Sequence, residues 1–334
     1  MSRLRYYLRR TAVSVVLIFF SASALFFCCR AMPGSAVDIV AVSGASPEQL
    51  AALRAKWGLD EPLHVQYYSY ITNLLTGNMG ESFRYGRPVT EITLNRIFNS
   101  FILVAPAITT AYVLGATFGG AMGQSPNSNA EKYGTITMGV VGTVPSFFLG
   151  LLLVLAFAQT LDLFPTSGML SISTQAQLGS NPSLLRLVTT ADFWIHYTLP
   201  FVTIVFNYLY YPALVMRTSV VEVANQNFVY LNRIKGLDRR TRLRHLLKHA
   251  SLPVITIFPL SLAKAIGGLI LVEIIFNWPG IGSLLVNAVL FRDYPVVQFV
   301  FFLVAIWVIV GNYVVDICYS LLDPRVSIDG GATD

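Results

Sequence analysis

The sequence is poor in charge and in cysteine, and it lacks the signature of a nucleotide-hydrolysing enzyme. Only 12% of its 334 residues are Asp, Glu, Lys or Arg, roughly half the share of an average soluble domain, whereas 54% are hydrophobic. No Gly-Lys pair occurs, which excludes the GxxxxGK[ST] loop that cradles phosphates. Cys28, Cys29 and Cys318 show neither metal nor disulfide spacing. The composition therefore indicates a membrane protein with no nucleotide site of its own.

Patterns typical of metal and catalytic sites are missing as well. His245 and His249 stand four residues apart, as two ligands on one helix face can, but HEXXH is absent and cations surround the pair. Ser, His and Asp residues are too scattered to suggest a catalytic triad. We expect no catalytic residue, no metal and no cofactor on this chain.

Six long apolar segments dominate what is present. Each is long enough to cross about 30 Å of hydrocarbon as a helix, and their nearly continuous apolarity fits helices rather than barrel strands. The first segment resembles a signal peptide in its basic start, but Phe26, Phe27 and Cys28 stand where a cleavage site needs small residues. The segments predict an all-α membrane protein with spans at residues 11–30, 97–123, 133–161, 193–216, 250–276 and 294–322.

The distribution of Lys and Arg predicts the orientation of these spans. Six spans place both termini on one side, and that side holds fourteen Lys and Arg residues against eight on the other. By the positive-inside rule the richer side is the cytoplasm. The net charge of +6 then reflects topology, and a nucleic-acid partner is disfavoured. Cytoplasmic segments are expected at residues 1–10, 124–132, 217–249 and 323–334. Extracytoplasmic segments are expected at residues 31–96, 162–192 and 277–293.

The segment Val221 to Pro253 is basic and has the periodicity of two short helices. Ala224, Phe228 and Leu231 form one apolar stripe in its first half. Gly236 supplies a stop, and Asp238 can cap the helix that follows. The second half has an apolar row and, on another face, a basic row: Leu243, Leu247 and Ala250, and Arg240, Arg244 and Lys248. The pattern predicts a folded surface held at the membrane face.

The long segment 31–96 also has helical signals. Ser46 begins a capping box, SPEQ, and Gly58 provides a stop. A second helix is expected from the spacing of Leu63, Tyr67, Tyr70 and Leu74. Two interpretations remain open: a lid over helix ends, or a landing site for an external partner.

A series of short motifs runs in order along almost the whole chain. The amino-terminal half contains MPG at 32–34, ASPEQLAALRAKWGLDEPLHVQY at 45–67, GRPV at 86–89 and VPSFFLGL at 144–151. The carboxyl half contains NFVYLNRIKGL at 227–237, LPVIT at 252–256, EIIFNWPGIG at 273–282, RDYPVVQ at 292–298 and DPRV at 323–326. Their joint order resembles the membrane-spanning permease subunit of a bacterial ABC importer, in the branch that handles dipeptides, oligopeptides and nickel or similar chelates.

The resemblance implies that Val221 to Pro253 contains the family's EAA loop, whose short helix sits in a cleft of a cytoplasmic ATP-hydrolysing subunit. The implied coupling element is Tyr230, Leu231, Asn232, Arg233, Ile234, Lys235, Gly236 and Leu237. The family usually has small residues where Leu231 and Asn232 stand. The implied partners are a second similar permease, two ATPase subunits that carry ATP and Mg, and an extracytoplasmic substrate-binding protein.

Five residues are candidates for the translocation path or its gate: Lys264, Glu273, Asn277, Asp316 and Pro145. Ionisable groups inside a membrane usually face a cavity or a partner. Lys264 and Glu273 are nine residues apart, so one continuous helix would hold them about 13 Å apart on opposite faces. Lys264 either offers a charge to an anionic substrate or pairs with Asp316 or the partner permease. Glu273 either makes a structural hydrogen bond or contacts substrate.

Other classes of protein remain open at this point. An ATP-independent secondary transporter or channel would have similar spans, and a membrane scaffold would need no cavity. The two basic helices would then lie on the membrane and bind anionic headgroups through Arg240, Arg244 and Lys248. The motif order favours the importer, which would carry peptides or, as the alternative, nickel or another metal chelate.

Overall fold

The computed structural model describes residues 3–31, 37, 41, 46–179 and 182–322. Helices dominate this part of the chain. No strand occurs in the described ranges, where β-structure is limited to one isolated bridge between Glu81 and Pro88. The chain divides into two compact units, residues 1–98 with 280–334 (unit 1) and residues 99–279 (unit 2). The expected all-α class is therefore confirmed.

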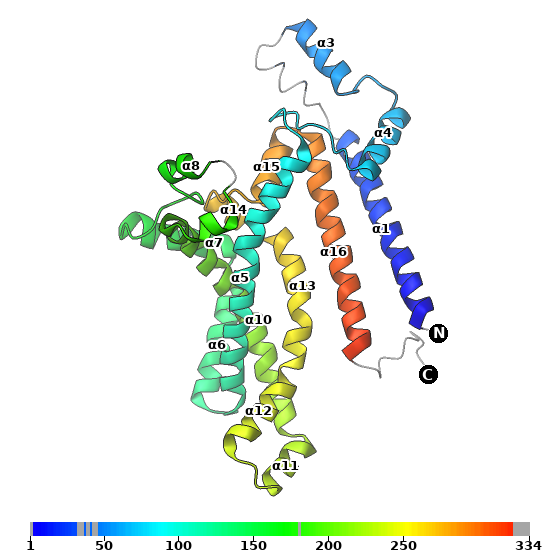
Figure 1. The fold of residues 1–334 in the computed structure, drawn as a ribbon. Helices are drawn as coiled ribbons and strands as arrows, with labels where there is room; N and C mark the ends of the chain where they lie inside the picture. The colour runs from blue at the N-terminus through cyan, green and yellow to red at the C-terminus, as the bar shows by residue number, and fades with distance from the viewer. Residues whose placement is uncertain (1–2, 32–36, 38–40, 42–45, 180–181, 323–334) are drawn as a thin grey trace. The chain divides into compact units, whose positions relative to one another are not determined.

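Among the described residues, four helices are long and apolar enough to cross a membrane (Figure 1). They are α1 (Arg3–Ala31), α5 (Val89–Gly123), α10 (Ala191–Ala224) and α16 (Tyr294–Leu322). A bent pair adds a fifth span if it is counted as one. The apolar part of α13 (Leu252–Gly268) is shorter than these spans. The protein is thus multi-pass, and the count of six spans stays a prediction.

The bent pair lies where one span was expected at residues 133–161. Helix α6 (Asn129–Thr143) and helix α7 (Ser146–Leu153), which continues into the π-helix η1 (Val154–Thr160), meet at an angle of 93°. Pro145 lies at the bend, and Val144 before it is extended. Proline has no amide hydrogen and keeps its preceding residue out of the helical region, which explains the break.

Helix α13 ends at Gly268, and Leu269 separates it from α14 (Ile270–Ile275). The expectation of one continuous helix through Lys264 and Glu273 is therefore wrong, and the spacing argument that kept these two residues apart no longer holds. Gly267 and Gly268 precede the break, and glycine weakens a helix because of its backbone freedom.

Close packing of α5 on α10 forms the centre of unit 2. A Cβ on Gly119 would lie 2.1 Å from the carbonyl oxygen of Ala213, and one on Gly123 would lie 2.7 Å from Cβ of Val220. Only glycine allows this approach of two backbones, as in small-residue contacts between membrane helices. Farther toward the start of α5, the buried Trp278 donates a hydrogen bond from Nε1 to the carbonyl of Asn99 at 3.0 Å. The remaining short helices of this unit are α8 (Ile172–Leu178), α9 (Leu184–Val188), α11 (Asn227–Ile234) and α12 (Arg239–Ala250).

Unit 1 consists of α1 and α16, which run side by side, with shorter helices near one end of this pair (Figure 1). The predicted capping box is confirmed, since the Gln49 amide donates to Ser46 Oγ and α3 (Pro47–Lys56) follows. The predicted second helix is also present as α4 (Leu63–Thr76), whose Tyr67 hydroxyl lies 2.7 Å from Ser23 Oγ of α1. Helix α15 (Ile281–Leu290) precedes α16.

Candidate docking surface

The expected helix pair lies at the end of unit 2 opposite α8 and α14 (Figure 1). Helix α11 ends at Ile234, and Gly236 has a φ of 70°, in the left-handed region that favours glycine. Asp238 caps α12 by accepting a hydrogen bond from the Thr241 amide at 3.1 Å. The predicted stop and the predicted cap are both confirmed.

Asp238 adds a negative charge at the start of α12. Hydrogen bonds from the Thr241 side chain and backbone lower its pKa below the ordinary value. The carboxylate is therefore ionised at neutral pH, where it complements the positive end of the helix dipole. This local arrangement separates the two helices and sets where α12 begins.

Helix α11 presents a compact apolar patch to the outside, which we call the α11 surface. Tyr230, Leu231 and Ile234 are 66%, 50% and 63% exposed. Arg233 and Lys235 beside them are also exposed. Grouped apolar side chains with a charged rim are typical of a surface that contacts another protein.

The predicted stripe of Ala224, Phe228 and Leu231 is wrong as a single helix face. Ala224 is the last residue of α10, and the chain leaves the helix at Asn225 before α11 begins. Phe228 turns inward, with its ring centroid 4.7 Å from that of His249, while Leu231 turns outward. The break in the helix axis separates residues that regular spacing would align.

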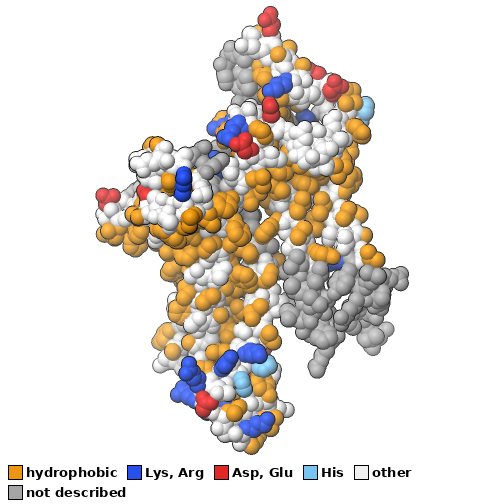
Figure 2. Space-filling view, viewed as in Figure 1, with side chains coloured by type: hydrophobic (Ala, Val, Ile, Leu, Met, Phe, Trp, Pro, Cys, Tyr) orange, Lys and Arg blue, Asp and Glu red, His pale blue; other side chains and the backbone are white. Residues whose placement is uncertain are grey.

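Helix α12 has the opposite arrangement of apolar and polar side chains. Leu247 packs against the core, where its Cδ2 would lie 3.3 Å from a Cβ on Gly120, and Ala250 is buried. The predicted basic row is exposed: Arg240, Arg244 and Lys248. Figure 2 shows Lys, Arg and His side chains gathered at this end of unit 2. The apolar face of α12 thus anchors the pair, and its basic face meets solvent or headgroups.

The pair is joined firmly to the long helices. The Ser251 amide donates to Leu247 of α12, and the Ile255 amide of α13 donates to Ser251, both at 2.9 Å. Asn232 lies 3.5 Å from His245, which connects α11 to α12. These contacts join α11 to α12 and α12 to α13, and α12 also packs on α10.

An ion pair that sequence reasoning missed supports α10 above this surface. Glu131, on the first turn of α6, is buried, and its Oε1 accepts a hydrogen bond from Arg217 Nε of α10 at 2.8 Å. The signal in the sequence was Ser128, three residues before Glu131, because this spacing is that of a capping box. Ser128 does cap α6, accepting from the Glu131 amide at 3.1 Å.

The candidates for the translocation path lie on different elements. Glu273 is 3% exposed, and Ser100 Oγ of α5 donates to its Oε1 at 2.5 Å. Asn277 is exposed after α14 with a φ of 45°, and Pro145 lies at the 93° bend. Lys264 and Asp316 lie in α13 and α16, but their side chains are outside the described residues. A role for these residues in translocation stays a prediction.

The fold and the α11 surface define a multi-pass helical membrane protein that presents a short helix pair at one end of unit 2. Residues 111–328 match the family described as binding-protein-dependent transport system inner membrane component, and residues 3–103 match the family described as the N-terminal part of such membrane components. The chain belongs to this family of inner-membrane permeases, and the resemblance found in its motifs is confirmed.

Relatives match over nearly the full length. The chain is 32% identical to the oligopeptide transport system permease protein AppB of Bacillus subtilis (strain 168), over 96% of this chain and 98% of that protein. It is 33% identical to the glutathione transport system permease protein GsiC of Salmonella choleraesuis (strain SC-B67), over 97% and 99%. A putative peptide permease of Brucella ovis is 32% identical over 97% and 99%.

Proposed function

We propose that this chain is the transmembrane permease subunit of an ATP-driven importer, and that it translocates peptides delivered by an extracytoplasmic binding protein. The relatives carry oligopeptide, glutathione and peptide in their names, which favours a peptide over a nickel or other metal chelate. The permease itself hydrolyses no ATP in this proposal. Two ATPase subunits bind ATP and Mg, and a second similar permease completes the channel.

The α11 surface carries this proposal. Three exposed apolar side chains on an eight-residue helix are unfavourable in water unless something covers them. We assign the covering partner as a cleft in an ATPase subunit, with Tyr230, Leu231 and Ile234 inserted and Arg233 and Lys235 at the rim. This assignment puts α11 and α12 in the cytoplasm. A cytoplasmic place for both chain termini is supported separately, by the distribution of Lys and Arg along the sequence.

The mechanism follows from the connections of this surface. When the ATPase subunits close around ATP, a helix inserted in one of them must move with it. Because α12 packs on α10 and continues into α13, a displacement that passes from α11 to α12 across the turn at Gly236 reaches the long helices. In this proposal the bend at Pro145 and the break at Leu269 are two positions where the helices change angle during transport. Glu273, Asn277, Lys264 and Asp316 remain candidates to line the path or to gate it.

The proposal is tested by purifying the tagged chain from native membranes in mild detergent, with identification of bound proteins and an ATPase assay. Wild-type chain should retain a second permease and P-loop subunits. Ile234→Asp should lose the P-loop subunits and the ATPase activity, because a carboxylate would be buried in the cleft. Lys248→Gln, at an exposed position of α12, is the matched control and should keep the P-loop subunits and the ATPase activity.

Two other outcomes would contradict the proposal. Recovery of the chain alone, without ATPase activity and with uptake driven by an ion gradient, would favour a secondary transporter. If Ile234→Asp had no effect while removal of Arg240, Arg244 and Lys248 released the helix pair from anionic vesicles, the pair would be a lipid-binding element.

A further inference from the structure

The segment 270–279, which consists of α14 and the turn after it, is deeply buried in unit 2. Val272, Glu273, Phe276 and Trp278 are at most 3% exposed. The segment lies at the end of this unit opposite α11 and α12 (Figure 1). The carboxyl of Glu273, a candidate for the translocation path, is therefore enclosed by protein and does not face an open path.

Two consecutive residues of α5 bind this segment at three points. Ser100, which is 2% exposed, donates from Oγ to Oε1 of Glu273 at 2.5 Å. Asn99 donates from Nδ2 to the Pro279 carbonyl at 2.9 Å, and its own carbonyl accepts from Nε1 of Trp278 at 3.0 Å. We call these three hydrogen bonds the α5 clamp. Buried polar groups are stable only when they are paired, so each bond favours keeping the two elements together.

Other elements of unit 2 hold the same segment. The Gly168 amide, in the loop before α8, donates to the Phe276 carbonyl at 2.7 Å. A Cβ on Gly150 of α7 would lie 3.2 Å from the Phe276 ring, so α7 packs closely on it. The ring centroids of Phe193 of α10 and Trp278 are 6.3 Å apart. The segment is therefore joined to α5, α7, α10 and a loop.

Helix α13, on the other side of the break at Leu269, is held by fewer hydrogen bonds. It packs on α10 and continues from α12. Among the side chains that the structure describes, its one hydrogen bond to another helix comes from the Tyr112 hydroxyl of α5, which donates to Ser261. Leu252 and Ile255 in its first turns are 54% and 59% exposed. The two sides of the break thus differ in how firmly their neighbours hold them.

We propose that Glu273 is a positioning residue, which together with Asn99 and Ser100 fixes α14 to α5, so that α13 turns against α14 at the break when α12 moves. This role rests on the proposed function, because the ATPase subunits are what moves α12. Glu273 then acts on transport through Ser100 and not by contact with the peptide. Without the clamp, α14 follows α13, and ATP is hydrolysed without transport.

The first test measures the clamp itself, in the full-length chain without ATPase subunits. Hydrogen exchange of peptides from 270–279 should be about tenfold faster in Ser100→Ala than in wild type, the factor for loss of one hydrogen bond to a carboxyl group. Exchange in α13 should not change. Thr109→Val is the matched control, because Thr109 is exposed and its hydroxyl donates to Ala105 of the same helix. Equal exchange in the two variants would overturn the proposal.

The second test measures transport in vesicles that contain both permeases, the ATPase subunits and the binding protein, with a mixture of radiolabelled di-, tri- and tetra-alanine. Complexes with Ser100→Ala should still hydrolyse ATP, but the peptide taken up per ATP should fall about tenfold. Glu273→Gln keeps an acceptor oxygen and should transport like wild type. Thr109→Val should also be unchanged.

Two outcomes of the transport test would overturn the positioning role. Uptake per ATP that is unchanged in Ser100→Ala would show that the clamp serves stability alone. A higher peptide concentration for half-maximal uptake in Glu273→Gln would show that the carboxylate contacts the peptide. Absence of ATP-driven uptake in wild type would instead contradict the proposed function, and hydrogen exchange would still show whether α5 fixes α14.

Discussion

Helices α11 and α12 follow each other in the chain, yet they place their apolar side chains in opposite directions. Helix α12 buries Ala250 and packs Leu247 on the core, while α11 exposes Tyr230, Leu231 and Ile234. The anchor of the pair is therefore inside this protein, whereas the apolar side chains of α11 face outward, where we propose that an ATPase subunit binds. A helix that exposes its apolar face needs a partner, and a helix that buries it serves as a support.

This contrast predicts that changes on α12 act on stability, and that changes on α11 act on assembly. The largest effect is expected for Leu247→Asp, which places a charge against the core. We expect a loss of about 3 kcal/mol or more in the free energy of unfolding, because an unpaired carboxylate would be buried. Thermal unfolding of the purified chain in detergent would measure it. An unchanged melting temperature would show that α12 does not anchor the pair.

The next effect concerns the α11 surface. Tyr230→Ala should weaken binding of the ATPase subunit by about 2 kcal/mol, or roughly thirtyfold, as expected for an aromatic anchor in a cleft. Stability of the isolated chain should change by less than about 0.5 kcal/mol, since the side chain is exposed. Titration of the chain with purified ATPase subunits, beside a melting curve, separates the two quantities. If Tyr230→Ala lowered both the stability of the chain and its binding to the ATPase subunit, α11 would not differ from α12 in its role.

Gly236 joins the two helices, and its replacement should have a smaller effect. A Cβ there would meet no atom within 4 Å, so the cost of Gly236→Ala is purely that of a left-handed backbone, about 1 kcal/mol. Gly236→Asn should cost less, because Asn tolerates this conformation. Melting curves of both variants test whether Gly236→Ala is the more destabilising of the two. Equal effects would show that the backbone conformation is not the cause.

The smallest effect is expected from the cap of α12, and it depends on pH. Because folding lowers the pKa of Asp238, its charge stabilises α12 above the ordinary Asp pKa of about 3.9. This contribution is lost as the pH falls through the lower, folded pKa. Hydrogen exchange of peptides from α12 should be faster in Asp238→Ala than in wild type at pH 7, and the two should converge at acid pH. If the two proteins still differed in hydrogen exchange at acid pH, the stabilisation by Asp238 would not depend on its charge.

Local features of this surface were predictable from the sequence, and features that depend on distant contacts were not. Gly236, Asp238 and the capping box at Ser46 act within a few residues, so a short window contains their signal. The inward turn of Phe228 depends on His249, and the position of Arg217 depends on Glu131. Contacts between separate helices leave no regular spacing in the sequence, so a short window does not reveal them.

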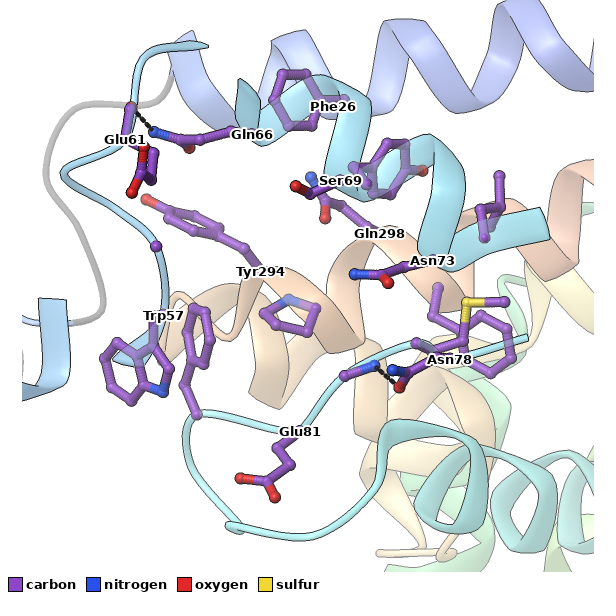
Figure 3. A pocket seen from close by; sticks show the side chains of 18 of the residues that line it. Phe26, Trp57, Glu61, Gln66, Ser69, Asn73, Asn78, Glu81, Tyr294 and Gln298 are labelled. Carbon is purple, nitrogen blue, oxygen red and sulfur yellow. Dashed lines mark hydrogen bonds between the residues drawn. The ribbon is translucent and has the colours of Figure 1, made fainter. Parts of the chain in front are cut away.

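Helix length was a further limit to prediction. Apolar runs mark what can enter a membrane, but they do not show where a helix bends. Pro145 was a signal for a bend and the structure has one, whereas the break at Leu269 follows two glycines whose effect was not anticipated. A cavity of about 400 Å³ in unit 1 (Figure 3) was equally hard to predict, because residues of α1, α3, α4, the loop after α4 and α16 line it together.

Crosslinking from single positions would show whether α11 sits in an ATPase subunit. A photoreactive benzoylphenylalanine would replace Ile234 in one variant and Arg240 in another, in native membranes. We expect a crosslink from position 234 to a P-loop protein and none from position 240. Crosslinks from both positions to lipid alone, or from position 240 but not from 234 to the P-loop protein, would contradict it.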